Sequence, residues 1–408
     1  IMSKCFICKS ESTKIILDLG ESPVANNLES DMSRSQKAKK YPLSLRKCQS
    51  KCSHIQIGNV INQEEIFNDY LYMPSFSRTL TNHLNEISSD IDNRFEFNDK
   101  SFIVDIGSND GTFLESASKF TKNILGVDPA KNLSKIANKK GIKTINNFFS
   151  DSIANEIKNN YGAADFIVST NTFAHTPEIN DFTEGLSTLI SDEGIIIIEI
   201  HYLGSMVDDN SFDTIYHEHF SYWSLENLNY LFEKHGLKIF DASIIPVHHG
   251  QLRIYISKSN NYKKTSSFKE LLENEKNDDL IGKKLNSFCK NVYKVKDELL
   301  DLFKNISNKG EKIYGYGAPA KASTLINFIG PSNLKNIYDK SELKQGKFIP
   351  GTSLEIKNPN EISKDSPDYI FLFAWNFKEE VINELKFKFN FKGKVIIPIP
   401  ELDIITIK

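Results

Sequence analysis

Four short apolar runs are spaced through the middle of the chain, and each is followed by a segment of helix length. They lie at residues 102–106, 124–128, 165–169 and 194–199. Near-continuous apolar strands that alternate with helices are typical of a parallel sheet covered on both faces. Ligands of such sheets bind outside the carboxyl ends of the strands. The pattern therefore predicts an α/β domain with its site at that edge.

The same pattern divides the 408 residues into three blocks. Residues 1–75 hold paired cysteines and short strand-like runs, 76–257 hold the four strands, and 258–408 open with a polar helical stretch and then alternate again. Segment 257–267 is polar and rich in Lys, Asn and Ser, which indicates a linker. We expect a small N-terminal metal-binding domain, a central Rossmann-like domain and a C-terminal Rossmann-like α/β domain.

The charge and hydropathy of the chain limit the classes of partner that it can bind. The net charge of −3 and the pI near 6.4 make no case for nucleic acid. Apolar runs stay well short of the roughly 18 residues of a membrane helix, and the first residues show no secretory pattern. We therefore expect a cytoplasmic protein with neither nucleic acid nor a membrane as partner.

Four of the five cysteines form two close pairs, Cys5 with Cys8 and Cys48 with Cys52. Two such pairs supply four soft ligands in a tetrahedral array, which is the geometry of structural zinc. Five cysteines are too few for a disulfide scaffold. Because four thiolates fill the shell, the spacing predicts a structural zinc ion and not a catalytic one. The alternative is four unligated cysteines in a core.

A glycine-rich turn, Asp-Ile-Gly-Ser-Asn-Asp-Gly-Thr, follows the first strand at 105–112. Glycines let the backbone turn sharply and approach a ligand. An aspartate at the end of the second strand can accept hydrogen bonds from both ribose hydroxyls of a nucleoside. The turn lacks the full pyrophosphate fingerprint, and its polar residues favour S-adenosylmethionine over a nicotinamide cofactor, the remaining alternative being carboxylates that only cap turns. The expected cofactor set is Asp105, Gly107, Asn109, Gly111, Asp128 and Asn171.

Ordered motifs extend these features over nearly the whole chain. They comprise the paired cysteines and segments 70–75, 106–111, 171–175, 216–222, 315–321 and 344–351. On these residues the sequence resembles the S-adenosylmethionine-dependent sugar C-methyltransferases, which make branched 3-C-methyl sugars from nucleotide-linked 4-keto deoxysugars. The resemblance implies a zinc domain, a cofactor domain and a C-terminal domain that helps hold the sugar nucleotide. By motif match it places functional residues at Tyr70, His175, Glu218 and His219.

Two segments depart from the pattern of the family. Glu199-Ile200-His201-Tyr202 stands where the family has Glu-x-Pro-Tyr, and 248–253 reads His-His-Gly-Gln-Leu-Arg where the family has His-Gly-Gly-Ser-Leu-Arg. Larger polar residues thus replace small or rigid ones. If they line the pocket, we expect a sugar other than the usual one.

Methyl transfer to a carbon beside a ketone needs a base, a donor to the enolate oxygen and a sulfonium methyl in line. Histidine suits the base role because its ordinary pKa is about 6.5. We expect His219 to be the base, Glu218 to orient it or contact sugar hydroxyls, and His175 to face the same cleft. The alternative is a set of hydrogen-bonded structural histidines.

The third block contains a strand-to-helix glycine turn at 315–318. Exposed N–H groups at such a turn suit phosphate, and a lysine one turn into the helix adds charge. The resemblance favours a diphosphate site here over a plain tight turn. The expected substrate-binding residues are Tyr72, Tyr222, Arg253, Tyr316, Gly317 and Lys321.

Two other functions stay open from the sequence. An O- or N-methyltransferase on the same scaffold would act on a hydroxyl or amine without an enolate. A zinc-stabilised binding protein that has lost catalysis would keep the fold alone, although the joint presence of His175, Glu218 and His219 argues against it.

Overall fold

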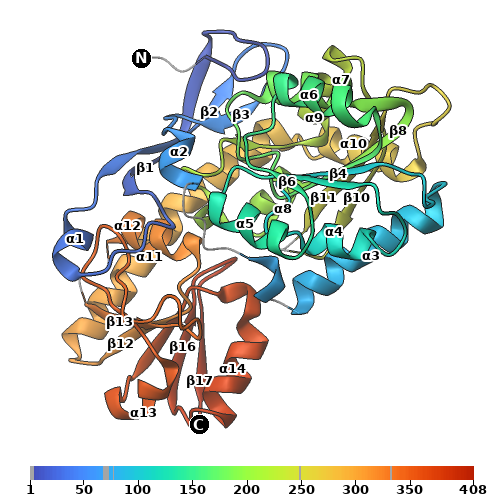
Figure 1. Ribbon diagram of the computed structural model, residues 1–408. Coiled ribbons are helices and arrows are strands. Elements are labelled where there is room, and N and C mark those ends of the chain that lie inside the picture. The colour runs from blue at the N-terminus through green and yellow to red at the C-terminus, as the bar shows by residue number, and fades with distance from the viewer. Residues whose placement is uncertain (1–3, 68–72, 77, 248–249, 331–332) are drawn as a thin grey trace.

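The computed structural model describes residues 4–408, except 68–72, 77, 248–249 and 331–332. Three sheets organise these residues, one in each predicted block (Figure 1). The expected α/β class with a small N-terminal zinc-binding domain and two Rossmann-like domains is confirmed. The domain limits at 75 and 257 stay a prediction.

The central sheet has seven strands. Their spatial order is β10 (Lys238–Ile245), β11 (Gln251–Ser257), β8 (Ile190–His201), β7 (Ala164–Thr170), β4 (Ile103–Ile106), β5 (Ile124–Val127) and β6 (Thr144–Ile145). The four strands predicted from the apolar runs, β4, β5, β7 and β8, are parallel neighbours, as expected. The hairpin β10–β11 closes one edge and pairs antiparallel with β8.

Helices cover both faces of this sheet, with α6, α7 and α9 on one side and α3, α4 and α5 on the other (Figure 1). Alternate residues of one strand therefore enter two different cores. Val104 and Ile106 pack in one apolar cluster, whereas Ile103 packs in the other with residues of α3. This explains why the strands are apolar throughout. The helices are α3 (Arg78–Arg94), α4 (Thr112–Ala117), α5 (Lys131–Lys139), α6 (Asp151–Tyr161), α7 (Ile179–Leu189), α8 (Leu203–Asp208), α9 (Leu225–Lys234) and α10 (Ser266–Asn277).

The C-terminal sheet has six strands. Its order is β14 (Ile356–Lys357), β13 (Leu334–Tyr338), β12 (Ile313–Tyr316), β15 (Tyr369–Leu372), β16 (Gly393–Ile397) and β17 (Asp403–Ile407). Only β17 runs antiparallel among these described strands. The accompanying helices are α11 (Leu285–Asn308), α12 (Ala320–Ile329), α13 (Ile362–Asp365) and α14 (Lys378–Phe387).

The N-terminal sheet is antiparallel and borrows a strand from the central block. It comprises β1 (Thr13–Pro23), β2 (Lys40–Cys48), β3 (Ile55–Ile57) and β9 (Ser221–Tyr222). Ile55 pairs with Tyr222 and Gln56 pairs with Ser221. Two short helices, α1 (Met32–Gln36) and α2 (Gln63–Phe67), belong to the same block. The small first domain is therefore joined to the second by backbone hydrogen bonds as well as by the chain.

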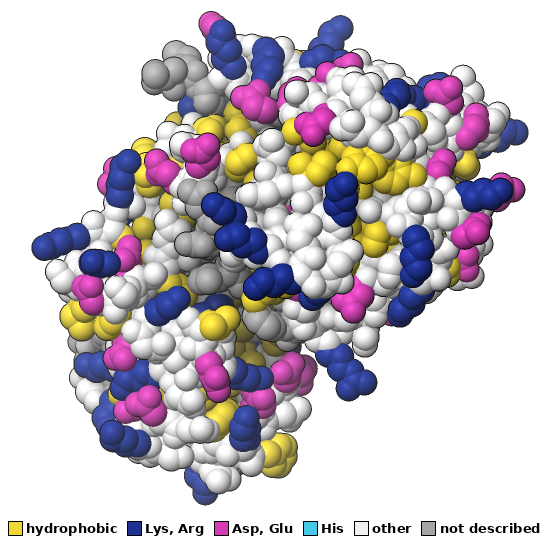
Figure 2. Space-filling view, viewed as in Figure 1, with side chains coloured by type: hydrophobic (Ala, Val, Ile, Leu, Met, Phe, Trp, Pro, Cys, Tyr) yellow, Lys and Arg dark blue, Asp and Glu magenta, His cyan; other side chains and the backbone are white. Residues whose placement is uncertain are grey.

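Basic and acidic side chains are intermixed over the face of the molecule seen in Figure 2. Among the described residues, no helix has both the length and the apolar character that a membrane span needs.

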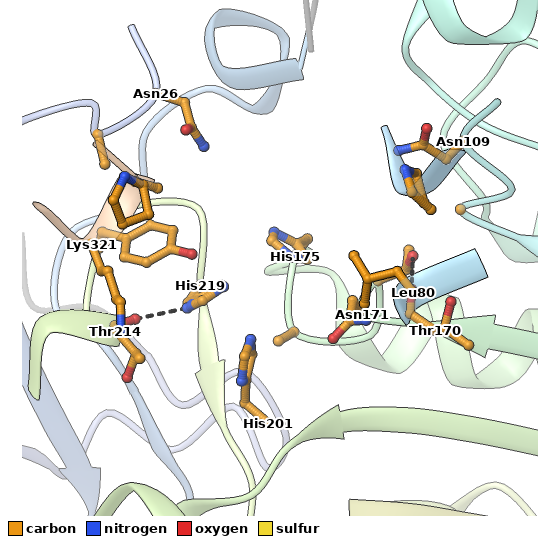
Figure 3. Close-up of a pocket in the computed structure, with 18 of the residues that line it drawn as sticks. Asn26, Leu80, Asn109, Thr170, Asn171, His175, His201, Thr214, His219 and Lys321 are labelled. Atoms are coloured by element: carbon orange, nitrogen blue, oxygen red, sulfur yellow. Dashed lines mark hydrogen bonds between the residues drawn. The ribbon is translucent and has the colours of Figure 1, made fainter. Parts of the chain in front are cut away.

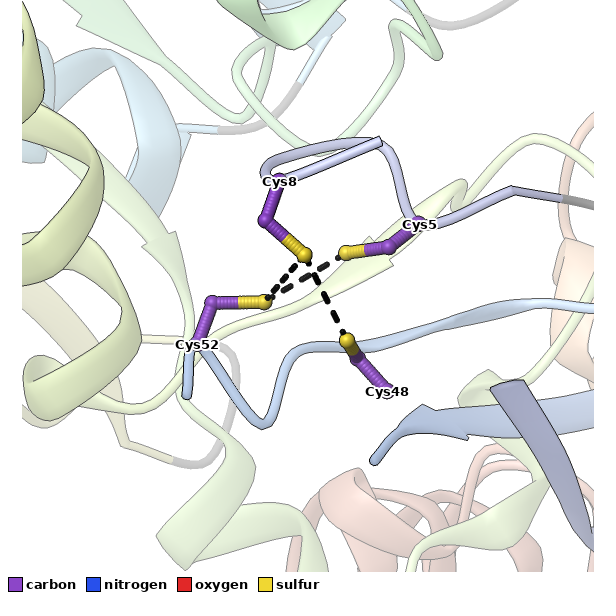
Figure 4. A group of neighbouring side chains, drawn as sticks. All are labelled: Cys5, Cys8, Cys48 and Cys52. Atoms are coloured by element: carbon purple, nitrogen blue, oxygen red, sulfur yellow. Dashed lines mark hydrogen bonds between the residues drawn. The ribbon is translucent and has the colours of Figure 1, made fainter. Parts of the chain in front are cut away.

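The four paired cysteines converge at one end of the N-terminal sheet (Figure 4). The Sγ atoms of Cys5 and Cys52 are 3.4 Å apart, those of Cys8 and Cys52 3.4 Å, and those of Cys8 and Cys48 3.6 Å. A tetrahedron with Zn–S bonds of about 2.3 Å has edges of about 3.8 Å. The donor set thus fits one zinc ion with no open position, and the predicted zinc-binding site is confirmed.

We expect one zinc ion per chain, measured by elemental analysis. Cys8→Ser should lose the metal and at least about 3 kcal/mol of stability, a small part of the roughly 10–16 kcal/mol that structural zinc binding supplies. The melting temperature should then fall by roughly 6–12 °C. Cys289→Ser is the matched control, because Cys289 is buried in α11 away from the cluster. A metal-free wild type of unchanged stability would contradict the prediction.

Candidate active site

A cavity of about 650 Å³ lies at the carboxyl ends of the central strands. Its walls come from all three blocks: Asn26 from the first, residues that follow β4, β5, β7 and β8 from the second, and 318–321 with 374–377 from the third. The parallel strands direct their loops to this one edge, as the sequence predicted. Figure 3 shows the labelled side chains around its middle.

The end of the cavity nearest β4 and β5 has the features of a nucleoside site. Asp128 follows β5, lines the cavity, and accepts hydrogen bonds from the backbone N–H groups of Asn109 and Ala130, both at 2.8 Å. Burial raises the pKa of its carboxyl to about 6. Each carboxylate oxygen keeps a second lone pair, so Asp128 can still accept from a ligand hydroxyl. Asn109 has a positive φ of 52° and also lines the cavity.

Gly107 is needed for packing as well as for the turn. A Cβ atom there would lie 1.8 Å from Oγ1 of Thr172, and its φ is 77°. Gly107 and Asn171 line the cavity, whereas Asp105 and Gly111, at the two ends of the turn, do not. Burial, together with the charge of Asp128, raises the pKa of Asp105 well above its ordinary value.

Asp110, a polar residue of the turn at 105–112, is not part of the cavity lining. It is fully buried, accepts a hydrogen bond of 2.6 Å from Oγ1 of Thr112, and lies 3.8 Å from Nζ of Lys140. Its carboxylate therefore secures the start of α4. The polar walls at this end come instead from Thr170, Asn171 and Thr172.

The motif at 216–220 forms a turn. The N–H of His219 donates to the carbonyl of Tyr216 at 2.9 Å, which closes the turn. His217 and His219 therefore point to different places. Nε2 of His217 lies 3.2 Å from the carbonyl oxygen of Pro42, and the ring stays outside the cavity lining.

His219 faces the cavity and is held in one tautomer. Its Nδ1 lies 2.7 Å from the carbonyl oxygen of Thr214 (Figure 3). A carbonyl only accepts, so Nδ1 carries the proton and Nε2 keeps a lone pair. Burial, with the neighbouring His175 as a second cause, lowers the pKa of His219 to about 3. The ring is thus a neutral acceptor of protons at neutral pH.

Three aromatic rings surround His219. The ring centroids of Tyr216, His201 and His175 lie 4.1, 4.9 and 5.0 Å from its own. His175 is partly exposed to the cavity, and desolvation lowers its pKa to about 4, with the charge of His201 as the second cause. All four side chains line the cavity. The structure thus brings the predicted pair His175 and His219 together.

Glu218 does not orient His219 as expected, since the carbonyl of Thr214 does so. Both carboxylate oxygens of Glu218 instead accept from Nδ2 of Asn26, at 2.7 and 2.8 Å. Burial raises the pKa of Glu218 to about 7, although the hydrogen bonds from Asn26 oppose the rise. Asn26 lines the cavity in its place. Glu218 therefore acts on the cavity through Asn26.

Most N–H groups of the glycine turn after β12 already donate to acceptors within the protein. Gly317 donates to the carbonyl of Tyr338 at 2.7 Å, Ala318 donates to Oδ2 of Asp339 at 2.7 Å, and Pro319 has no N–H. The expected cradle of loop N–H groups is thus absent from this part of the described chain. Gly317 is outside the cavity lining, and a Cβ there would lie 2.8 Å from that of Ala374.

Positive charge at this end comes from two lysines that line the cavity, Lys321 and Lys344. Nζ of Lys321 donates to Oδ1 of Asn376 at 2.9 Å, lies 3.8 Å from Asp213, and sits 4.0 Å from the ring centre of Trp375. Burial lowers the pKa of Lys321, and the charge of Asp213 opposes this decrease. Lys344 donates to the carbonyl of Ala318 at 2.8 Å.

The other predicted substrate residues fall in different places. Tyr222 lines the cavity, and burial raises its pKa. Tyr316 is outside the lining and donates to Glu384 at 3.1 Å. Arg253 is also outside it, because two of its nitrogens lie 2.6 Å from Oε1 of Glu199 in a buried ion pair. Tyr70 and Tyr72 lie outside the described residues.

Sequence reasoning missed Asn26, Asp213 and Thr214. Asn26 stands 192 residues before its partner Glu218, and nothing in its neighbourhood marks it. Asp213 accepts from Nε1 of Trp375 at 2.7 Å across another long interval. Thr214 acts through its backbone, which no side-chain pattern reveals. Tyr216 and His201 stood inside segments already singled out, so their polar character was the available signal.

Three regions of the chain match known family models. Residues 5–67 match a zinc binding domain, 80–242 a methyltransferase domain and 246–400 a C-methyltransferase C-terminal domain. Among solved structures, a SAM-dependent methyltransferase of Anabaena variabilis is 17% identical, covering 42% of this chain and 84% of its own, with a TM-score of 0.35. Magnesium protoporphyrin IX methyltransferase of Synechocystis is 10% identical, covering 50% and 100%, with a TM-score of 0.36.

Similarity to a curated relative extends over the full chain. The C-methyltransferase NovU of Streptomyces niveus is 31% identical over 410 residues, which cover 99% of this chain and 97% of the relative. The aligned length includes the cysteine cluster, the cofactor turn and the histidine turn. The chain therefore belongs to the S-adenosylmethionine-dependent sugar C-methyltransferase family.

Proposed function

We propose that the protein transfers a methyl group from S-adenosylmethionine to a carbon beside the ketone of a nucleotide-linked keto-deoxysugar. The observation that carries the proposal is the state of His219. The carbonyl of Thr214 holds the proton on Nδ1, and Nε2 faces the open middle of the cavity beside His175 (Figure 3). A neutral imidazole fixed in this way presents an Nε2 lone pair that can accept a proton from carbon, although the burial that keeps it neutral also weakens it as a base.

S-adenosylmethionine would bind at the end of the cavity lined by Asn109, Asp128 and Asn171. When bound, it supplies an electrophilic methyl group. Asp128 would accept hydrogen bonds from the ribose hydroxyls, which favour its ionised form against the burial that raises its pKa to about 6. The positive φ of Gly107 and of Asn109 would let the backbone of this turn approach the cofactor closely.

Removal of the proton makes an enolate, and its oxygen needs a donor in place before the reaction. His175 lies on the other side of His219 from Thr214 and fits this role in its neutral form (Figure 3). Tyr216 packs against His219 and restricts its ring. Glu218 fixes Asn26, whose side chain reaches the wall of the cavity and can contact a sugar hydroxyl.

The diphosphate of the sugar nucleotide would lie at the C-terminal end of the cavity. Lys321 and Lys344 supply positive charge there, and the first turn of α12 adds its N-terminal dipole. This revises the sequence prediction, because the glycine turn itself has few N–H groups to offer. The nucleotide would then span from the C-terminal domain towards His219.

A transfer to oxygen or nitrogen is the alternative for the same scaffold. It needs a base but no proton exchange at carbon. Solvent deuterium exchange next to the ketone, in the absence of S-adenosylmethionine, separates the two reactions. Absence of exchange on any 4-keto sugar nucleotide would favour transfer to oxygen or nitrogen.

Consistent with a reducing compartment, we also propose a cytoplasmic location.

The first test of the mechanism is His219→Asn. The change keeps a polar side chain but removes the proton acceptor, so methyl transfer and deuterium exchange should fall by about 10²–10⁴-fold. His175→Asn should have a milder effect if His175 only polarises the ketone. His217→Asn is the matched control in the same turn, because His217 lies outside the cavity lining. Exchange at the wild-type rate in His219→Asn would show that the base lies elsewhere, with Glu218 or Tyr70 next to test.

The second test concerns the cofactor. Asp128→Ala should weaken S-adenosylmethionine binding, measured by calorimetry, by about 1.5–3 kcal/mol, as expected for hydrogen bonds to a charged group. Asp339→Ala is a matched control, since Asp339 accepts the N–H of Ala318 in the same way after β13 of the C-terminal sheet. Equal cofactor affinity in the wild type and Asp128→Ala would refute the ribose assignment.

The third test is the pH dependence of exchange. His219 is competent when neutral, and its lowered pKa of about 3 keeps it neutral well below pH 6.5. The value of kcat/KM should therefore show no loss from His219 between pH 7 and 5. A limb near pH 7 would belong to Glu218, whose pKa is raised to about 7, and should vanish in Glu218→Gln. A limb near 6.5 that survives in Glu218→Gln would contradict the buried neutral base.

A further inference from the structure

Among the described histidines that line the cavity, His201 has no role in the proposed mechanism. His201 ends β8, lines the cavity, and its ring points towards the gap between His219 and His175 (Figure 3). Its ring centroid lies 4.9 Å from that of His219, almost the same as the 5.0 Å for His175. A sugar carbon within reach of Nε2 of His219 therefore lies close to both other rings.

The wall behind His201 is polar as well. His201 pairs with Gln251 across β8 and β11, and the side chain of Gln251 donates to Oδ1 of Asn171. Gln251 is fully buried, and Asn171 lines the cavity with a positive φ of 55°. The strand register thus sets an imidazole beside an anchored amide. A neutral imidazole offers one donor and one acceptor, and it suits a hydroxyl or an amino group.

Binding of a sugar whose apolar edge faces this polar wall is unfavourable. Groups left unpaired on binding lose their hydrogen bonds to water, and sites built in this way discriminate against ligands that lack the matching group. His201 also stands where the chain departs from the Glu-x-Pro-Tyr pattern, in which proline offers no side-chain hydrogen bond. His201 therefore adds a polar side chain next to the carbon that reacts.

We propose that His201 is a specificity-determining residue that hydrogen-bonds a hydroxyl or amino substituent on the methylated carbon of the sugar or on the carbon next to it. This inference rests on the proposed function. It assigns the acceptor to the more polar keto sugars, in which the reacting carbon or the ring carbon next to it carries a hydroxyl or an amino group. His219 keeps the role of base, and His175 that of donor to the ketone oxygen.

The test compares three thymidine diphosphate-linked probes: 4-keto-6-deoxyglucose, its 2-deoxy analogue and its 3-deoxy analogue. Deuterium exchange without cofactor and methyl transfer with cofactor give kcat/KM for each probe. The wild type should prefer the fully hydroxylated probe over one of the analogues by about 10–100-fold, a modest share of the discrimination that hydrogen-bonding sites reach.

His201→Leu should remove this preference. Its kcat/KM should fall on the hydroxylated probe and stay unchanged on the disfavoured analogue, so that the ratio approaches one. His201→Gln, which keeps a donor and an acceptor, should restore much of the ratio. His235→Leu is the matched control, because His235 pairs with Glu184 at 2.7 Å outside the cavity lining, and it should leave the ratio at the wild-type value.

The outcomes separate this inference from the proposed function. An equal loss on all probes in His201→Leu would make His201 a structural support of His219 and overturn the inference alone. A wild type that exchanges all three probes equally would do the same. A wild type that neither exchanges nor methylates any probe would remove the proposed function, and the inference with it.

Discussion

The turn at residues 216–220 is the constraint on which the active site depends, since each of its polar groups is held by a different part of the chain. His217 contacts the carbonyl of Pro42, and Glu218 binds Asn26, both in the N-terminal block. His219 contacts the carbonyl of Thr214. Phe220 donates to Ala174 and accepts from Ile57. The contact with Thr214 sets the tautomer of the imidazole, and the other contacts hold the turn that carries it against the rest of the chain.

The zinc cluster is part of the same construction. Strand β3 begins three residues after Cys52 and pairs with β9, which begins two residues after His219. His54, directly before β3, packs against Trp223 with ring centroids 4.6 Å apart, and its Nε2 lies 3.1 Å from Oγ of Ser221. Asn227 of α9 donates to the carbonyl of Cys52 at 2.5 Å. The metal end of the small sheet thus supports the strand that leaves the catalytic turn, without any ligand position open to substrate.

The two Rossmann-like units hold their glycine turns with the same pattern of hydrogen bonds. Gly107 donates to Val127 and Asn109 to Asp128, and in the third block Gly317 donates to Tyr338 and Ala318 to Asp339. In both, an aspartate after the second strand accepts an N–H from the glycine turn after the first. The carboxylate fixes the turn in each case. Whether the aspartate can also contact a ligand depends on whether it lines the cavity. Only Asp128 of the two is in that lining.

The sequence by itself determined the parallel strands, the zinc ligands and the edge of the sheet that holds the site, because each depends on local periodicity or on close spacing. It also identified His175 and His219, which stand directly after strands or in a recognisable motif. It could not place Asp110, Arg253 or Glu218, since a charged side chain takes the partner that burial leaves within reach: Thr112, Glu199 and Asn26. Those partners, and the proton on Nδ1 of His219, follow from contacts between distant segments and were decided only by the tertiary structure.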